Sequence, residues 1–369
     1  MSPAFPPPSA LPRTRMPARR LPRTLHGLAA LCCASGALAG LALLALPAHA
    51  GPSDDNALLA GPPERSVVEW LVRLQQAARV PSYTGTFVVS SAAGAMASAR
   101  IWHVCHGPDQ LERVEALSGP PRATYRHNND VVIFQPDTRT VRTEQRESSG
   151  GVFQSLLRPG EESAVARLYG ARQTGQGRVA GFDADIVHMV PHDHWRYGYR
   201  IWSEKRTGLV VKMQTLDEDG RVLEQSAFSE LQFNAPLQAH QLTQMMRDTQ
   251  GYRVQKPDQF KTTAEAEGWA LKRDVPGFRP QHCYRRQKAG ATEPPVVQWI
   301  FSDGLATVSL FMEPFQAGRH AHPGVSAMGA THTLMQRVPD ASGAWWLTAV
   351  GEVPPHTLQA FADALERTR

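Results

Sequence analysis

Two groups of side chains contain the residue types in this chain most capable of chemistry. They are His103, Cys105 and His106, and then His188, His192 and His194. Imidazole nitrogen and thiolate sulfur are the ligands that zinc prefers, so three or four of these groups in tetrahedral geometry would form a metal site. The alternative is structural. His103 and Cys105 belong to a predicted strand, and the segment 192–194 is typical of a polar hairpin tip.

The usual catalytic motifs are missing from Gly51 onward. There is no G-x-S-x-G, no phosphate-cradling glycine loop and no H-E-x-x-H. Asp193 beside Arg196 is typical of a turn with a surface ion pair rather than of an acid–base pair. We therefore expect a protein that is not an enzyme and holds no cofactor or metal.

The elements that position these residues include four consecutive strands predicted within residues 179–233. One of them alternates, with Trp195, Tyr197, Tyr199 and Ile201 on one face and, apart from Trp202, charged or small residues on the other. The strand Leu209–Leu216 repeats the pattern, with Leu209, Val211 and Met213 opposite Lys212 and Gln214. These patterns predict an antiparallel sheet with one apolar, aromatic face.

The first fifty residues predict a secretory signal peptide. They contain five arginines and no acidic residue, followed by an apolar run at 28–46 and an A-x-A pattern that ends at Ala50. We expect cleavage after Ala50 and export to the periplasm, with translation starting at Met1 or Met16. An uncleaved anchor is the alternative, because the run is nearly long enough to span a bilayer.

Cleavage would change the charge and the cysteine content. Lys+Arg falls from 39 to 34 and equals Asp+Glu at 34, so the basic character belongs to the leader and no nucleic-acid partner is expected. The remaining cysteines, Cys105 and Cys283, would either form one disulfide or stay as two separate thiols.

The rest of the chain predicts a two-domain α+β protein. After a flexible segment at 51–65, a capping box at Ser66-Val67-Val68-Glu69 begins a helix. Residues 66–235 then form a large curved antiparallel sheet with covering helices. Residues 236–263 form a helical and polar linker, and residues 264–369 a smaller α+β domain in which Ala306–Met312 alternates cleanly.

Several segments together carry a resemblance to a known family. They are SYTGTFVV, GPPRATYRHNNDVVIFQPD, RYGYRIW, TGLVVKMQTLDEDGRVLEQ, SDGLATVSLFMEP and VGEVPPHTLQAFADAL. In this order they resemble the RseB/MucB family over about residues 66–369. The resemblance implies an N-terminal open half-barrel similar to the lipoprotein carriers LolA and LolB. It also implies a periplasmic negative regulator of the envelope-stress sigma factor.

The implied partner is the periplasmic part of a membrane-spanning anti-sigma factor of the RseA/MucA type. The regulator would shield it from proteolysis and be released by a lipid or lipopolysaccharide. We expect much of the anti-sigma contact in residues 264–369. The alternative is a periplasmic lipid or lipoprotein carrier of LolA type. The oligomeric state, including a homo-oligomer, stays open.

An open half-barrel with a helix across it leaves a groove suited to an acyl chain or an apolar peptide. The candidate ligand-binding residues are Phe87, Tyr197, Tyr199, Ile201, Val211 and Met213. The alternative is that these side chains pack on the helix at 66–79 as ordinary core.

Overall fold

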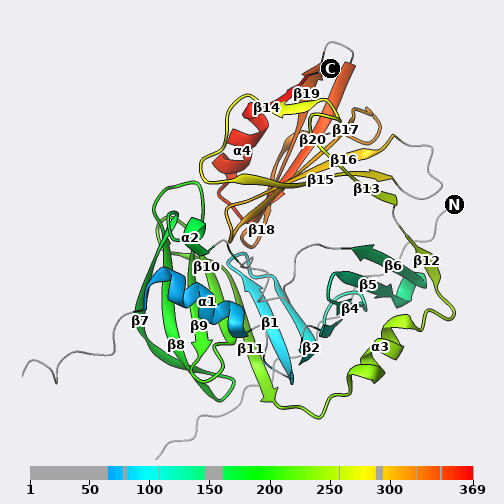
Figure 1. Ribbon diagram of the computed structural model, residues 1–369. Helices are drawn as coiled ribbons and strands as arrows, with labels where there is room; N and C mark the ends of the chain where they lie inside the picture. The colour runs from blue at the N-terminus through cyan, green and yellow to red at the C-terminus, as the bar shows by residue number, and fades with distance from the viewer. Residues whose placement is uncertain are drawn as a thin grey trace, which may run out of the picture. The chain divides into compact units, whose positions relative to one another are not determined.

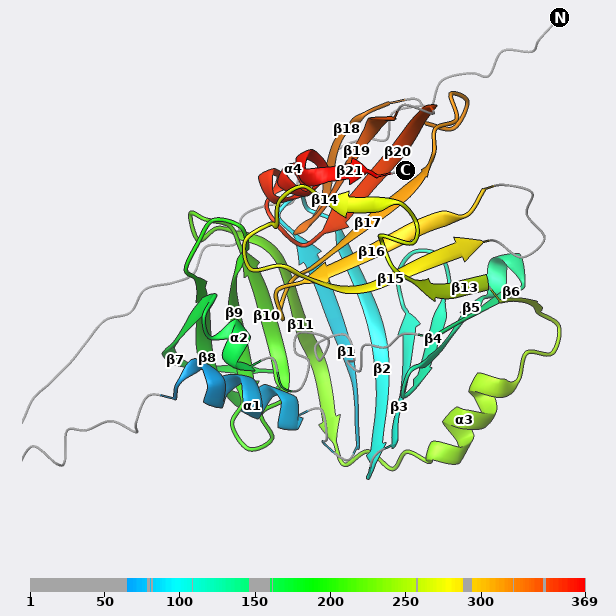
Figure 2. The same ribbon diagram turned by 45° about the horizontal axis from the view of Figure 1, so that its top comes forward.

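The computed structural model describes residues 65–77, 80, 82–107, 109–145, 160, 162–256, 258–287, 294–320, 322–340 and 343–368. The predicted leader, its cleavage site after Ala50 and the alternative start at Met16 lie outside the described residues, as does most of the segment 51–65. The described part is rich in strand and has few helices. It confirms the predicted α+β class, with one large open curved sheet and a second, smaller sheet (Figures 1 and 2).

The large sheet has twelve strands in the order β12-β6-β5-β4-β3-β2-β1-β11-β10-β9-β8-β7. All neighbouring pairs are antiparallel except β12 with β6. Its strands are β1 (Ser82–Ser91), β2 (Met96–His106), β3 (Asp109–Ala116), β4 (Ala123–His127), β5 (Asp130–Gln135), β6 (Thr140–Gln145), β7 (Tyr169–Val179), β8 (Phe182–Pro191), β9 (Gly198–Glu204), β10 (Val210–Leu216), β11 (Val222–Phe233) and β12 (Arg253–Gln255).

The four strands predicted within residues 179–233 are confirmed as β8 to β11. However, β9 begins at Gly198 and not at Trp195. Three strands of the large sheet, β4, β7 and the short β12, escaped prediction. β4 has five residues and follows a Pro-Pro pair, and β7 is an edge strand with three glycines and little apolar alternation.

Helix α1 (Val67–Ala77) begins at the predicted capping box. The Ser66 amide donates to Glu69 Oε2 at 2.7 Å, and the Glu69 amide donates to Ser66 Oγ at 3.3 Å. The helix lies across the strands β7 to β11 together with the short helix α2 (Glu162–Val165) (Figures 1 and 2). Trp70 and Leu71 are fully buried on the side that faces the sheet.

The sheet has an apolar cluster on each of its two faces. Paired residues share a face, so the row Tyr83–His103–Glu112 lies on one side and the row Trp102–Arg113–Tyr125 on the other. The first face includes the cluster beneath α1, to which Tyr83 belongs. The second is covered by α3 (Ala239–Arg247), whose Leu242 and Met246 pack on it.

The smaller sheet has the order β13-β15-β16-β17-β20-β19-β18. Its strands are β13 (Asp258–Thr262), β15 (Arg279–Gln287), β16 (Val296–Ser302), β17 (Thr307–Pro314), β18 (Gly324–Met328), β19 (Thr331–Asp340) and β20 (Gly343–Gly351). Helix α4 (Pro355–Ala364) packs on β19 and β20, and a separate ribbon joins β14 (Trp269–Leu271) to β21 (Leu365–Arg367).

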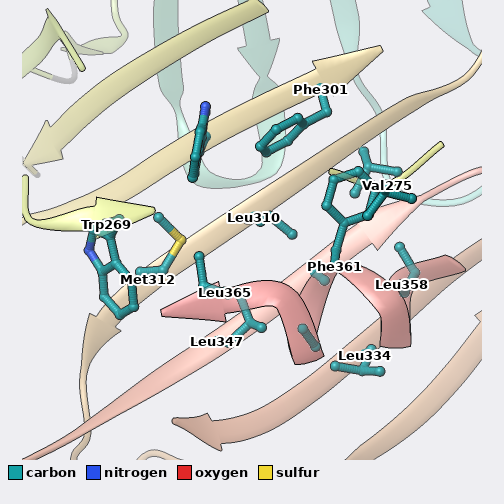
Figure 3. Close-up of a cluster of buried hydrophobic side chains, with 14 of the residues drawn as sticks. Trp269, Val275, Phe301, Leu310, Met312, Leu334, Leu347, Leu358, Phe361 and Leu365 are labelled. Carbon is teal, nitrogen blue, oxygen red and sulfur yellow. The ribbon is translucent and has the colours of Figure 1, made fainter. Parts of the chain in front are cut away.

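The core of this second unit lies between its sheet and α4 (Figure 3). The predicted apolar face of β17 is confirmed, because Ala306, Val308, Leu310 and Met312 are all at most 2% exposed. Phe361 and Leu358 of α4 pack against that face. The predicted linker at 236–263 contains α3 as expected, and it also contains β12 and β13, each of which extends one sheet.

We expect Leu310→Ala to lower the free energy of unfolding by about 2–5 kcal/mol, because it leaves a cavity in a closed core. Urea denaturation followed by tryptophan fluorescence measures this. Val325→Ala is the matched control, since Val325 lies in the same sheet but is 54% exposed, and it should change stability by less than about 0.5 kcal/mol. Equal effects of the two substitutions would contradict the described core.

Candidate functional site

The predicted apolar face is present, but it is packed. Phe87, Tyr199, Ile201 and Val211 are each at most 4% exposed and belong to the same cluster as Trp70 and Leu71 of α1. Met213 is partly buried against this cluster. A ligand could therefore reach these side chains only if α1 moved away from the sheet, and their role in ligand binding stays a prediction.

Tyr197, the sixth candidate, lies elsewhere. It is 4% exposed, and its hydroxyl is 3.4 Å from Nδ1 of His332 on β19 of the smaller sheet. Burial raises the pKa of Tyr197 to about 12. Tyr197 is thus part of a contact between the two sheets, and it does not belong to the apolar cluster under α1.

The prediction of a surface ion pair at Arg196 is wrong. Arg196 is 1% exposed, and its Nη1 donates to Asp303 Oδ2 at 2.6 Å. Nε donates to Asp193 Oδ1 at 2.8 Å, and Nη2 donates to the Pro276 carbonyl at 2.7 Å. The alternation that predicted an outward-facing Arg196 applies only within a strand, and residues 195–197 precede β9.

Asp303 completes what we call the Arg196 contact, which comprises Tyr169, Asp193, Arg196 and Asp303. The Tyr169 hydroxyl donates to Asp303 Oδ2 at 3.0 Å, and the amides of Leu305 and Ala306 donate to Oδ1 at 2.8 and 2.7 Å. The Asp303 carboxylate therefore accepts hydrogen bonds on both oxygens, which a buried charge requires.

The charge states in this contact follow from its surroundings. Burial acts to lower the pKa of Arg196, but the Asp193 hydrogen bonds and the Asp303 charge raise it overall, so the guanidinium stays charged. Burial and the Asp303 charge raise the pKa of Tyr169 well above its ordinary value. The phenol therefore keeps its proton and remains a donor to Asp303.

The loop around Arg196 is held on both sides. Trp195 packs on the core of the smaller sheet, and its carbonyl accepts a hydrogen bond from Thr357 Oγ1 of α4 at 2.9 Å. The His194 carbonyl lies 2.8 Å from His356 Nε2. Gly277, with φ +79°, lies so close to the guanidinium that a Cβ atom there would be 2.5 Å from Arg196 Nη2. Only glycine fits at this position.

The members of the two histidine groups lie in different surroundings, with His103 buried and His106, His192 and His194 exposed. His103 is 1% exposed and stacks on Tyr83 with ring centroids 4.7 Å apart, while its Nδ1 is 3.6 Å from Glu112 Oε2. His192 Nδ1 lies 3.2 Å from the Arg167 carbonyl. Burial, together with nearby arginines, lowers the pKa of His188. Within the described residues, no group of three or more His, Cys, Asp or Glu could hold a metal ion.

Cys105 and Cys283 are thiols and share no disulfide. Cys283 is 6% exposed, and burial raises its pKa to about 12. Cys105 is half-buried on β2. The second of the two alternatives for these cysteines, two separate thiols, is the one present.

A groove lies between the two sheets, with a volume of about 840 Å³. Its lining comes from the ends of β4 to β6, from α3 and from the edge strands β12 and β13, with Tyr284 of β15. Three basic side chains, Arg247, Lys256 and Lys261, line it together with Asp130 and Glu144. No sequence pattern indicated this groove, because its walls come from separate segments of the chain.

Two family models match the chain. The MucB/RseB N-terminal domain matches residues 66–246, and the MucB/RseB C-terminal domain matches residues 263–366. Among curated proteins, the sigma factor AlgU regulatory protein MucB of Pseudomonas aeruginosa is 31% identical over 302 residues, which is 80% of this chain and 89% of that protein. The sigma-E factor regulatory protein RseB of Haemophilus influenzae is 24% identical, covering 84% of this chain and 93% of that protein.

Solved structures are similar over the same range. The chain resembles MucB in its complex with MucA(peri), with a TM-score of 0.63 and 26% identity over 82% of this chain and 99% of that one. A second complex, Pseudomonas aeruginosa MucA/MucB, gives a TM-score of 0.64 with the same identity and coverage.

Breaking the Arg196 contact should separate the two units. Arg196→Ala leaves the Asp303 carboxylate buried without its counter-charge. We therefore expect the free energy of unfolding to fall by about 3–5 kcal/mol and the urea transition to split in two. Asp219→Asn is the control, since Asp219 belongs to an exposed pair with Arg221, and it should change stability by less than about 1 kcal/mol. A single transition with an unchanged midpoint for Arg196→Ala would count against the contact.

The two thiols should react differently in residues 51–369. With a pKa of about 12 and 6% exposure, Cys283 stays protonated and shielded at pH 8, so an aromatic disulfide reagent should modify one thiol per native chain. Cys105→Ser should abolish that reaction, and urea should release the second thiol. Equal, rapid reaction of both cysteines in the native protein would show that β15 is not packed as described.

Proposed function

The chain belongs to the MucB/RseB family, and we propose that it is a periplasmic negative regulator of an envelope-stress sigma factor. In this proposal it binds the periplasmic part of a membrane-spanning anti-sigma factor, shields it from proteolysis, and is released by a lipid or lipopolysaccharide. The observation that carries the proposal is the match of both family domains, in order, to relatives named as sigma factor regulatory proteins.

The relative's complex with MucA(peri) supports the binding part of the proposal. That structure aligns with 82% of this chain, so the alignment extends over both family domains. None of the helices among the described residues is both long and apolar enough to cross a membrane. The predicted signal peptide supports a periplasmic location, and the family is one of regulators, which agrees with the absence of catalytic motifs from Gly51 onward.

Release by a lipid follows from linkage. A ligand that binds only to a form of the protein with low affinity for the partner shifts the population toward that form. It thereby lowers the affinity for the partner by the difference between the ligand's own binding free energies for the two forms. The apolar cluster beneath α1 is suited to an acyl chain, but Trp70 and Leu71 now fill that face. Tyr169 belongs to this cluster and also donates to Asp303 of the smaller unit. Entry of an acyl chain under α1 would therefore disturb the Arg196 contact.

The experiment that tests the function is binding of purified residues 51–369 to the periplasmic segment of the host's membrane anti-sigma factor, with and without lipopolysaccharide. We expect tight binding that lipopolysaccharide weakens, and protection of the segment from its first protease. Lipid uptake without partner binding would instead identify a carrier.

A disulfide can test whether α1 must move. A Cβ atom at Gly208 would lie 3.5 Å from Ala77 Cβ, which is within the range for a disulfide. We expect the oxidised Ala77→Cys/Gly208→Cys protein, made in a Cys105→Ser background, to bind the partner but resist release by lipopolysaccharide. Its reduced form is the matched control, because both forms share the strain of a non-glycine residue at φ +80°.

The reduced form should release the partner at the lipid concentration that acts on the unaltered protein. If the oxidised and reduced proteins release the partner equally, the proposal that the lipid enters under α1 is wrong.

A further inference from the structure

We propose that the outer face of strands β7 to β10 binds the anionic surface of a phospholipid bilayer. The inference rests on the proposed function, because a partner that spans the membrane would hold this chain close to a bilayer. It adds a second attachment that does not involve the partner. We name the site the outer basic face, defined by Arg172, His188, Arg200, Trp202 and Lys212.

The register of the large sheet places these five side chains together. Residues that pair directly share a face, and successive pairs alternate between the two faces. Two adjacent rows of paired residues cross the strands, namely Arg172–His188–Arg200–Gln214 and Ile186–Trp202–Lys212. Tyr199 and Ile201 alternate with these residues along β9 and pack in the cluster beneath α1. The outer basic face is therefore on the opposite side of the sheet from that cluster.

The outer basic face carries positive charge that no carboxylate in its own rows offsets. Where the two rows cross the described strands β7 to β10, they contain no aspartate and no glutamate. Arg200 Nη1 donates to the uncharged Gln214 Oε1 at 3.3 Å. Lys212 Nζ lies 4.4 Å from the centre of the Trp202 ring. An anionic surface would supply the counter-charge that these contacts do not.

The basic groups of this face also act on one another. Burial, followed by the charges of Arg200 and Arg172, lowers the pKa of His188. Burial and the charge of Arg200 lower the pKa of Lys212 as well. Both shifts indicate that positive charge is crowded here. Phosphate groups against the face would relieve this repulsion, whereas a neutral partner would not.

The extent of the face favours a surface over a single small anion. Arg172 lies on β7 and Lys212 on β10, so the cations are spread over roughly 14 Å across the strands. One phosphate group cannot contact cations that far apart, but the headgroups of a bilayer form a continuous layer. Trp202 lies among the cations, and indole rings are enriched at the level of lipid headgroups. Val190, two residues from His188 on β8, is 44% exposed and adds an apolar contact.

Attachment to the bilayer would strengthen partner binding without any new contact to the partner. A protein that binds both a membrane-anchored segment and the membrane itself makes the second of these contacts as an intramolecular event. Each basic group near an anionic surface contributes only modestly, and salt screens the attraction. The outer basic face alone therefore gives reversible binding, and loss of the partner would also free the chain from the membrane.

The test measures cosedimentation of residues 51–369 with vesicles of phosphatidylcholine, either pure or with about 30% phosphatidylglycerol as the anionic lipid. We expect binding to the anionic vesicles only, and a fall of at least about tenfold when salt rises from about 0.05 to 0.5 M. Arg172→Glu/Lys212→Glu should weaken binding at least about tenfold. Arg200→Gln should also weaken it, and this second variant introduces no negative charge.

The matched control is Arg122→Glu/Arg139→Glu, which changes the net charge by the same amount. Both arginines are exposed, with Arg122 just before β4 and Arg139 between β5 and β6, in the other half of the large sheet. We expect this variant to bind the anionic vesicles like the unaltered protein. Circular dichroism and urea denaturation establish that each variant is folded. In solution, all variants should bind the periplasmic segment of the host's anti-sigma factor with equal affinity.

The outcomes separate the outer basic face from the proposed function. Equal vesicle binding by the folded double variant and by its control overturns the face and leaves the proposed function standing. If the double variant loses the partner segment in solution, the face contacts the partner and the proposal is wrong. Binding of inorganic phosphate without binding of vesicles would identify a small-anion site and also overturn it. Vesicle binding by a protein that does not bind the segment supports the face and overturns the proposed function.

Discussion

The burial of one charged side chain constrains the rest of this structure. A guanidinium without solvent costs several kcal/mol unless carboxylates and carbonyls surround it. Arg196 meets this requirement only by drawing on both units, with Asp193 from its own loop and Asp303 and the Pro276 carbonyl from the smaller one. In either unit alone, Arg196 or Asp303 would lose the charged partner that the other unit supplies. The ion pair therefore determines which surface of the smaller unit packs against the large one, more than it adds to the free energy of unfolding.

The same contact gives the two units a physical connection. Tyr169 packs in the apolar cluster of the large sheet while its hydroxyl bonds to Asp303, and Trp195 packs in the core of the smaller unit. Side chains from each unit thus belong to the core or the polar network of the other. Two well-packed units joined in this way respond by discrete rearrangement rather than by gradual bending. A regulator that must first hold and then release a partner benefits from that behaviour.

The sequence predicted the features that depend on local residue patterns. It did not predict the features that depend on contacts between residues far apart in the chain. The capping box at Ser66, the alternation of β17 and the four strands β8 to β11 were predictable, because period-two burial and capping chemistry are local. Arg196 was not, since its burial depends on Asp303, 107 residues away. β7 and β13 were missed because edge strands bury little and need no apolar alternation. The groove between the two sheets was not predicted either, because its walls come from separate segments of the chain.

Five of the six predicted ligand-binding residues, all except Tyr197, show where pattern reasoning stops. An apolar face on a curved sheet looks the same in sequence whether it holds a ligand or a helix, and here α1 covers it with Trp70 and Leu71. Displacing those two side chains would expose apolar area worth about 1.5–3 kcal/mol each. An acyl chain that buries a similar area repays this cost, whereas a short apolar ligand does not. A helix packed over the face would therefore set a threshold on chain length, which suits a sensor better than an open groove would.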